Sequence, residues 1–481
     1  METTLIIGPP GTGKTKTLGD IFERELNEYG TAPNRIAYVS FTREGTYAGV
    51  QRVMERFKLT AAQLPYCRTW HSLVFKQIGA RREMMMDKTR FKQLSDALGM
   101  SFVGHYTADF MHDDDKLLFL NDLRRNNIKA FERYMGNDVN FQRLNYVARQ
   151  YRAYKTAFGV YDFTDLLEVA IANNESIDVD AVMMDEAQDY PTIQWQLAYV
   201  LFGKAKRWYI AGDDDQAIYT WAGADIDKFM RISPNIQILA TSWRLPDNIL
   251  AFAKRIARRI HKRLPKDYHG TGKQGELKRL SDLSMVRAEL NKHPNESWLL
   301  LSRNNKFLAE YAKLLHEEGF VYSLKGVLSI KPVYLEWVGA YIAKQSGAAL
   351  DNASAEKLGL LIVDAAAINK PWYENTKMSA ENADYVRRFL ARFPGTYKVP
   401  LDGKGVPLIR VNTIHTVKGA EAENVVILSD ITQRIEENMF ENPDDEHRVF
   451  YVAATRASKR LFLVTNTLSK YSYTWPSLEG K

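Results

Sequence analysis

Residues 8–15, Gly-Pro-Pro-Gly-Thr-Gly-Lys-Thr, constrain the fold of this chain more than any other stretch. A short apolar segment at residues 5–7 precedes them, and residues 16–29 are predicted to form a helix. A strand, a G-x-x-x-x-G-K-T loop and a helix in this order form a phosphate site. The glycines let backbone N–H groups point inward, and the helix N-terminus adds partial positive charge. A plain Gly/Pro-rich turn is the alternative, but four fixed positions in this context favour a nucleotide.

The loop predicts ATP and Mg²⁺ as the bound species. Gly11, Thr12 and Gly13 are expected to hold the phosphates through their backbone. Lys14 is expected to reach the β- and γ-phosphates, and the Thr15 hydroxyl to ligate Mg²⁺.

Length and composition narrow the class of protein. A chain of 481 residues is too long for one core and is expected to form several units. The formal net charge of +7 permits a polyanionic partner without requiring one. The single cysteine, Cys67, excludes an internal disulfide and fits a reducing compartment. No apolar run approaches the roughly 18 residues of a membrane span, and the first strand begins too early for a signal peptide. We therefore expect a cytoplasmic protein without membrane contact.

Strands and helices alternate in both halves of the chain. This pattern predicts an α/β fold with parallel sheets, in which ligands bind at the carboxyl ends of the strands. Two stretches, 77–158 and 328–397, show helical periodicity with little strand signal and are predicted to be helical insertions. The first α/β domain is then expected at 1–76 and 159–236, and the second at 237–327 and 398–481.

Acidic residues follow two of the predicted strands. Residues 179–184 end in Asp185 and Glu186, and residues 208–211 end in the acidic cluster 212–216. Asp185 suits the shell of a magnesium ion, and Glu186 can orient or deprotonate an attacking water. Alone, such a pair would equally fit a solvated strand end, but the phosphate loop favours the catalytic interpretation.

Eight motifs together resemble the UvrD/Rep-like superfamily 1 DNA helicases, and they occur in the order found in that family. They are residues 8–15 (GPPGTGKT), 40–42 (SFT), 69–72 (TWHS), 185–189 (DEAQD), 212–224 (GDDDQAIYTWAGA), 242–244 (SWR), 413–421 (TIHTVKGAE) and 451–457 (YVAATRA). The resemblance covers both halves of the chain apart from the two insertions. It implies two RecA-like P-loop NTPase domains with ATP held between them.

The resemblance also implies roles at the nucleotide. Gln216 would sense the γ-phosphate from the first domain, while Arg244 and Arg456 would reach it from the second domain as arginine fingers. Trp243 would stack on adenine, although a core tryptophan is the alternative. Gly419 and Glu421 would also contact the nucleotide.

Single-stranded DNA is expected along the aromatic motifs, because base stacking holds a strand without sequence preference. The residues that the resemblance places on the strand are Phe41, Thr42, His71, Tyr219, Trp221, Asn305, Thr413 and His415. The two histidines could instead be structural. A basic stretch at 254–263, predicted as one helix with a charged face, could track phosphates or simply be solvated. The acidic tract 112–115 is predicted to be a solvated loop rather than a metal site.

The resemblance implies a monomeric motor that moves 3′ to 5′ on single-stranded DNA and acts at junctions with duplex. A nucleic-acid-dependent ATPase that remodels complexes without processive unwinding is the second hypothesis, and a nucleotide-gated binding switch is the third. The short insertions favour a phage or mobile-element origin, which would place the protein in a host cytoplasm.

Overall fold

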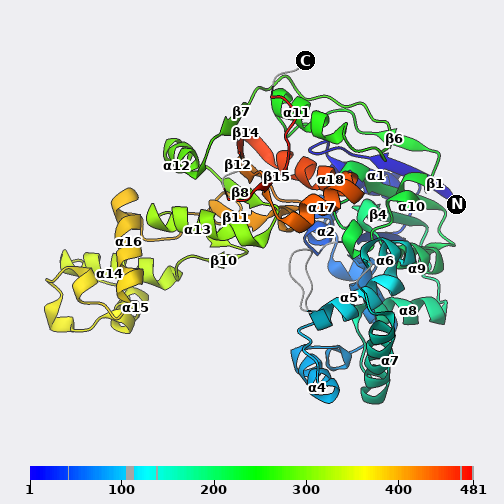
Figure 1. Ribbon diagram of the computed structural model, residues 1–481, viewed down its shortest axis with the longest axis horizontal. Coiled ribbons are helices and arrows are strands. Elements are labelled where there is room, and N and C mark those ends of the chain that lie inside the picture. The colour runs from blue at the N-terminus through cyan, green and yellow to red at the C-terminus, as the bar shows by residue number, and fades with distance from the viewer. Residues whose placement is uncertain (42, 105–112, 137–138, 466–467, 479–481) are drawn as a thin grey trace. The chain divides into compact units, whose positions relative to one another are not determined.

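The computed structural model of the chain describes residues 1–41, 43–104, 113–136, 139–465 and 468–478 (Figure 1). These residues divide into two compact units. Unit 1 comprises residues 1–244 and 259–271, and unit 2 comprises residues 245–258 and 272–481. Each unit is built on its own β-sheet, so the predicted α/β class with parallel-dominated sheets is confirmed. No helix in the described ranges is both long and apolar enough to cross a bilayer.

Unit 1 contains a six-stranded sheet in which all neighbouring strands are parallel. In spatial order its strands are β3 (Cys67–Thr69), β2 (Ile36–Ser40), β4 (Ala181–Asp185), β5 (Arg207–Gly212), β1 (Glu2–Ile7) and β6 (Ile236–Ile238). Strands β2, β4 and β5 are buried along almost their whole length, and β1 is buried in its second half, Leu5–Ile7. Burial on both faces explains why these buried stretches are mostly apolar rather than alternating.

Helices cover both faces of this sheet. One face packs against α1 (Lys14–Asn27) and α2 (Arg43–Phe57). The other packs against α3 (Trp70–Gln77), α8 (Phe163–Asn173) and α9 (Thr192–Phe202). Because successive strand residues face opposite sides, Ile6 contributes to the first core and Ile7 to the second. The short helix α10 (Ile226–Arg231) leads into the edge strand β6.

The stretch between α3 and α8 is helical and has its own apolar core. Its helices are α4 (Lys88–Leu98), α5 (Asp113–Asn126), α6 (Ile128–Tyr134) and α7 (Phe141–Phe158). The acidic tract begins α5: Asp114 accepts from the Ser101 backbone N–H, and Asp115 from those of Val103 and Gly104. Among the described residues no acidic cluster forms a metal site. The aspartates are therefore structural, part of a helix start rather than a free loop.

Unit 2 contains a seven-stranded sheet that is parallel except at its β9–β10 hairpin. Its spatial order is β10 (Val327–Leu328), β9 (Ser323–Leu324), β11 (Ile409–Thr413), β8 (Trp298–Ser302), β12 (Ala422–Leu428), β14 (Ala457–Val464) and β7 (Glu276–Leu280). A small antiparallel pair joins β13 (Asp430–Ile431) to β15 (Tyr471–Ser472). The helices near this sheet are α11 (Asp247–Ala257), α12 (Leu283–Lys292), α13 (Leu308–Glu317), α17 (Gln433–Glu441) and α18 (Pro443–Ala454).

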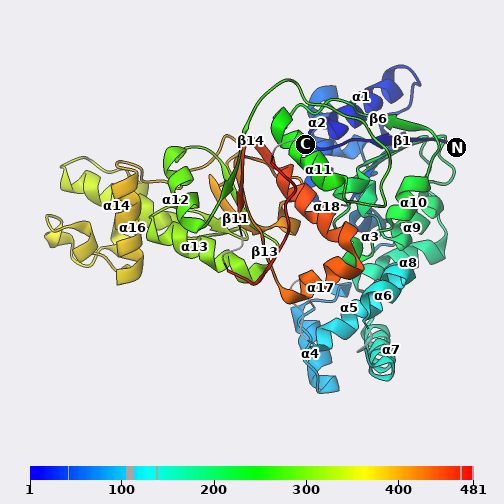
Figure 2. The same ribbon diagram turned by 45° about the horizontal axis from the view of Figure 1, so that its top comes forward.

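A second helical region within unit 2 has a separate core. It contains α14 (Pro332–Gln345), α15 (Asn352–Leu361) and α16 (Ala380–Arg392). Figures 1 and 2 both show α14 and α16 side by side, and Trp337 and Tyr385 from the two helices are buried in their shared core.

The structure divides the chain differently from the sequence prediction around residue 240. The expected boundary between residues 236 and 237 lies inside β6, which pairs with β1 in the first sheet. Residues 239–244 and 259–271 also belong to unit 1. The predicted basic helix at 254–263 is wrong at its C-terminal end, because α11 stops at Ala257. Arg263 beyond it pairs with Asp215 in unit 1 instead of extending a charged face.

Candidate functional site

The phosphate loop lies between β1 and α1, as the sequence predicts. Gly11 and Gly13 have φ angles of +74° and +87°, in the left-handed region that glycine adopts without strain. The Lys14 ammonium donates to the carbonyl oxygen of Gly8 at 2.9 Å. A side chain at position 8 would collide with Lys14, because an added Cβ would lie 2.0 Å from its Cγ. The Lys14 side chain thus packs closely against the backbone of the loop at Gly8, and its ammonium group lies at the loop.

Two carboxylates stand beside this loop at the carboxyl end of β4. Glu186 has φ +51° and ψ +38°, an uncommon backbone conformation for a non-glycine residue. Its Oε1 lies 3.9 Å from the Lys14 Nζ, and its Oε2 accepts a hydrogen bond from the Gln188 amide at 2.6 Å. The turn therefore directs the Glu186 carboxylate toward the phosphate loop.

Asp185, the last residue of β4, is almost fully buried. Its Oδ1 accepts from the Glu186 backbone N–H at 2.9 Å, and its Oδ2 accepts from the Tyr38 hydroxyl at 2.7 Å. Burial, followed by the nearby charge of Glu186, raises the pKa of Asp185 to about 6, although Tyr38 and Lys14 act in the opposite direction. A divalent cation would favour the ionised form that a metal ligand needs.

The acidic cluster after β5 is neutralised internally. The Lys266 Nζ lies 2.5 Å from Oδ1 of both Asp213 and Asp214 and 3.1 Å from Oδ2 of Asp215, and all four side chains are fully buried. Burial alone would lower the pKa of Lys266, but the three aspartates together raise it above its ordinary value. Sequence analysis missed Lys266, since nothing in its own neighbourhood marks it as their partner.

Gln216 is held inside this cluster. Its side-chain amide donates to Asp213 Oδ2 at 2.8 Å, and the Asp213 backbone N–H donates to the Gln188 side chain at 3.1 Å. Gln188 also contacts Glu186, so hydrogen bonds connect the ends of β4 and β5. The three predicted residues Asp185, Glu186 and Gln216 thus occupy one side of unit 1.

Residues 242–244 lie directly on the phosphate loop. The Ser242 hydroxyl donates to the Pro10 carbonyl at 2.7 Å, and the Trp243 backbone N–H donates to the Gly11 carbonyl at 2.9 Å. An added Cβ at Gly11 would lie 2.5 Å from Cβ of Arg244. These residues belong to unit 1, whereas the sequence placed Arg244 in the second α/β domain. The Trp243 side chain is 67% exposed and is therefore not a core tryptophan.

Arg456 is folded against the backbone of unit 2. Its Nε donates to the Val452 carbonyl at 2.9 Å and its Nη2 to the Thr455 hydroxyl at 3.0 Å, and the residue is almost fully buried. Gly419 has a φ angle of +85°. Glu421 forms an ion pair with Lys404, whose Nζ lies 2.9 Å from the Glu421 Oε1. The nucleotide contacts expected of these unit 2 residues stay predictions.

Aromatic side chains gather near the ends of β2 and β5 in unit 1. The rings of Phe41 and Tyr219 are 5.3 Å apart, and Trp221 lies 6.1 Å from Phe119 of α5. His71 packs edge-on against Phe163 at 5.3 Å. Of the strand-binding candidates in this unit, Thr42 lies outside the described residues.

The remaining strand-binding candidates lie at the carboxyl ends of neighbouring strands in unit 2. Thr413 ends β11 opposite Ser302, which ends β8, and Asn305 follows three residues later. His415 is half-buried, and burial, then Arg303 and Lys418, lower its pKa well below the usual value. His415 is therefore neutral at pH 7 and able to accept or donate a hydrogen bond.

A glycine-rich loop between a strand and a helix, with an aspartate and a glutamate ending a neighbouring strand, defines the class of P-loop nucleotide-binding proteins. Residues 1–237 match the UvrD/REP helicase N-terminal domain, and residues 373–467 match the UvrD-like helicase C-terminal domain. Together these stretches make up more than half of the sequence. The chain belongs to the UvrD/Rep family of superfamily 1 helicases.

Curated relatives agree with this assignment. The chain is 25% identical over 358 residues to the ATP-dependent DNA helicase Rep of Escherichia coli K12, covering 67% of this chain and 53% of that protein. It is 26% identical over 283 residues to the ATP-dependent DNA helicase PcrA of Staphylococcus epidermidis RP62A, covering 54% and 39%. The chain thus spans about half the length of the curated relatives it matches.

Proposed function

We propose that this chain is an ATP-dependent DNA helicase that moves 3′ to 5′ along single-stranded DNA and unwinds duplex. The observation that supports the proposal is that the Glu186 carboxylate lies 3.9 Å from the Lys14 ammonium of the phosphate loop, with Asp185 next to Glu186. Family membership and the Rep and PcrA relatives support ATP hydrolysis and a DNA substrate. The direction of movement rests on family resemblance.

The donors of unit 1 fit a nucleotide with Mg²⁺. The loop offers backbone N–H groups and the Lys14 ammonium to the phosphates, while Thr15 and Asp185 supply the hard oxygen atoms that Mg²⁺ prefers. Bound Mg²⁺ would neutralise charge on the β- and γ-phosphate oxygens. Glu186 would orient and deprotonate the attacking water, and Gln216 would respond to the γ-phosphate. The Trp243 backbone is hydrogen-bonded to Gly11, and its exposed ring would stack on the base.

Two guanidinium groups, those of Arg244 and Arg456, would stabilise the negative charge that develops on the γ-phosphate during hydrolysis. The Cβ of Arg244 lies next to Gly11 of the phosphate loop, which supports a contact of its guanidinium group with the γ-phosphate. Arg456 would exchange its carbonyl partners for phosphate oxygens when ATP is bound, because a guanidinium spreads its charge over several of them. This exchange would couple the nucleotide state of unit 1 to unit 2.

The DNA strand would be held by stacking and backbone contacts. Phe41, Tyr219 and Trp221 offer partly exposed rings on unit 1, and stacking contributes about 1–3 kcal/mol per base. Thr413, His415 and Asn305 would contact phosphate or sugar from unit 2. The net charge of +7 is compatible with this partner.

Strand displacement on tailed duplexes tests the proposal. A duplex with a 3′ single-stranded tail should be unwound in the presence of ATP and Mg²⁺, and a duplex with a 5′ tail should not. Lys14→Ala should abolish activity by removing the phosphate cation. Glu186→Gln should retain nucleotide binding and lose at least about a hundredfold in turnover, as expected for a lost general base.

Each other result has a definite meaning. Equal unwinding of both tails would contradict the direction. ATPase activity stimulated by poly-dT without displacement would favour the translocase or remodelling hypothesis, and no stimulation at all would favour a binding switch. Full activity of Lys14→Ala would remove the ATP site.

A further inference from the structure

Tyr38 makes a contact that the family motifs do not include. It lies in β2 with its side chain on the face covered by α1 and α2, and it is buried. Its hydroxyl donates to Oδ2 of Asp185 at 2.7 Å across the neighbouring strand β4. The remaining carboxylate oxygen, Oδ1, is held by the Glu186 backbone N–H. Asp185 is thus fixed from both oxygens.

The position of the Tyr38 ring depends on a glycine in α2. An added Cβ at Gly49 would lie 2.5 Å from the Tyr38 hydroxyl oxygen and 2.7 Å from Cζ. Glycine within a helix is unfavourable relative to alanine. Here it leaves the space in which the phenol reaches Asp185. Tyr38 and Gly49 therefore act as a complementary pair of a large and a small residue.

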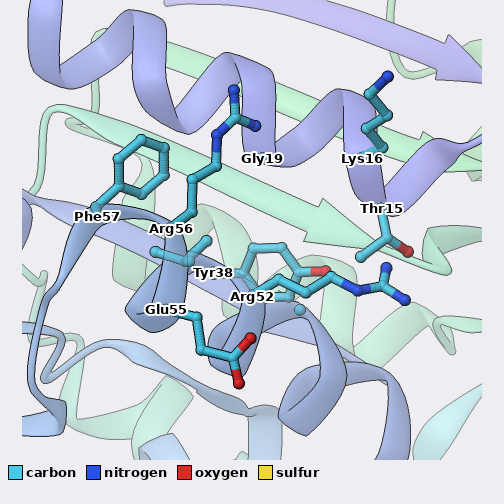
Figure 3. Close-up of a pocket in the computed structure, with 10 residues that line it drawn as sticks. Thr15, Lys16, Gly19, Tyr38, Arg52, Glu55, Arg56 and Phe57 are labelled. Atoms are coloured by element: carbon cyan, nitrogen blue, oxygen red, sulfur yellow. The ribbon is translucent and has the colours of Figure 1, made fainter.

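A cavity of about 530 Å³ connects this pair to the phosphate loop. It lies between α1 and α2, and its lining includes Thr15, Tyr38, Gly49 and Arg52 (Figure 3). The Tyr38 hydroxyl points toward the end of the cavity where Thr15 lies (Figure 3). Thr15 and Asp185 are the two side chains proposed to hold Mg²⁺, so the phenol stands next to the metal position.

We propose that Tyr38 is a positioning residue for Mg²⁺, which sets the orientation of the Asp185 carboxylate by a hydrogen bond and is itself admitted by Gly49. The inference rests on the proposed function of the same site. A carboxylate oxygen that accepts one hydrogen bond keeps a second lone pair for a metal-bound water. A fixed carboxylate loses less rotational freedom when the ion binds, and outer-shell donors of this kind commonly tune metal affinity.

Tyr38→Phe tests the role because it keeps the ring and removes only the donor. We would titrate Mg²⁺ against binding of an N-methylanthraniloyl ATP analogue by fluorescence, and measure Mn²⁺ affinity in the presence of ADP by electron paramagnetic resonance. The half-saturating Mg²⁺ concentration should rise about tenfold, with a matching loss in Mn²⁺ affinity. Binding of the analogue without metal should not change.

Tyr190→Phe is the matched control. The Tyr190 hydroxyl is equally buried and donates to the backbone carbonyls of Val39 and Asp185, at 3.1 and 3.0 Å. Its loss should lower thermal stability and leave the Mg²⁺ midpoint where it was. A purely structural role of Tyr38 would make the two variants behave alike, which would overturn the proposal.

Gly49→Ala gives an independent variant in which the hydroxyl is retained but displaced. It should reproduce the raised Mg²⁺ midpoint of Tyr38→Phe, and an unchanged midpoint in both variants would overturn the role of Tyr38. The proposed function fails separately: the unmodified chain would then show no Mg²⁺-dependent binding of the analogue.

Discussion

Two residues near the phosphate loop, Glu186 and Trp243, adopt unfavourable conformations or environments. Glu186 has a left-handed backbone conformation, and its carboxylate faces Lys14. Trp243 is about two thirds exposed, while its backbone N–H donates a hydrogen bond to Gly11. Both features are expected to reduce the stability of the fold, because the Glu186 backbone is strained and the Trp243 side chain leaves a large apolar ring in water. Such costs are typical of residues kept for a ligand.

At this scale we predict that Tyr219→Ala weakens binding to single-stranded DNA. The ring contacts Phe41 at 5.3 Å and is partly exposed, and losing one stacked base costs about 1–3 kcal/mol, or roughly 5- to 150-fold in affinity. Fluorescence anisotropy with a labelled oligothymidylate measures the change. Phe440→Ala is the control, since Phe440 is 82% exposed in unit 2 and has no proposed strand contact. Equal losses in both variants would argue against the stacking site.

At the scale of elements, residues 259–271 form a strap that returns to unit 1 and is fixed by buried charge. Lys266 is surrounded by Asp213, Asp214 and Asp215, and Arg263 forms two hydrogen bonds to Asp215. Removing one partner from such a cluster leaves uncompensated buried charge. The strap is therefore part of the core of unit 1 and not a linker.

Lys266→Met should destabilise the protein by about 3–5 kcal/mol, measured by urea denaturation followed by tryptophan fluorescence. Lys262→Met is its control in the same strap: Lys262 pairs with Asp227, but both side chains are substantially exposed, so the loss should stay below about 1 kcal/mol. Similar losses in the two variants would contradict the buried cluster.

Ion pairs to Asp162, which join α5 and α7 to the start of α8, are expected to make stability depend on pH in the acidic range. Asp162 caps α8 and receives ion pairs from Lys155 at 2.5 Å and Arg125 at 2.9 Å. Burial alone would raise the pKa of Asp162, but Lys155 and Arg125 outweigh it and lower the pKa to about 2. Because the folded pKa lies below the unfolded value of about 3.9, the stabilisation is complete above pH 5 and is lost as the pH falls toward 2.

Asp162→Asn should therefore lower the free energy of unfolding by about 2 kcal/mol at pH 7, and the difference from the unmodified chain should shrink between pH 5 and pH 2. Asparagine still caps a helix, so the ion pairs are the main loss. Asp87→Asn, at the cap of α4, is the control. A difference that is constant across this pH range would contradict the assignment.

The sequence was sufficient for features that are local and insufficient for those that depend on distant pairing. The phosphate loop and the acidic ends of β4 and β5 follow from residues that are adjacent in the chain. The Tyr38–Asp185 bond joins positions 147 residues apart, and Lys266 meets Asp213 over 53 residues. The predicted basic helix was too long because the charge periodicity continues past Ala257, where α11 ends. Lys262 and Arg263 beyond it form ion pairs with Asp227 and Asp215, which lie far away in the sequence.

At the scale of the whole molecule, most of the residues proposed to bind the nucleotide lie in one of the two units. The phosphate loop, Asp185, Glu186 and residues 242–244 all belong to unit 1, while unit 2 has a separate sheet and separate cores. A ligand stabilises the state that binds it, by about 2.7 kcal/mol at a hundredfold excess over its dissociation constant.

Mg²⁺ with ADP should therefore slow hydrogen exchange of backbone amides in β1, β4 and β5 more than in β8, β11 and β12. Mass spectrometry of exchanged peptides measures both sheets in one sample. Lys14→Ala with the same nucleotide is the control and should show no added protection in unit 1. Equal protection of the two sheets would contradict a nucleotide site built mainly from unit 1.

The chain passes between the two units three times within a short interval, after residues 244, 258 and 271. No single cut can therefore yield two self-sufficient halves. A fragment ending at residue 271 would carry α11 away from its sheet and present Ile249, Phe252 and Ile256 to solvent, whereas one ending at 244 would leave three aspartates without their lysine. Anyone who wishes to express the units separately must splice the chain, joining residue 244 to 259 through a designed turn and grafting α11 onto the other product.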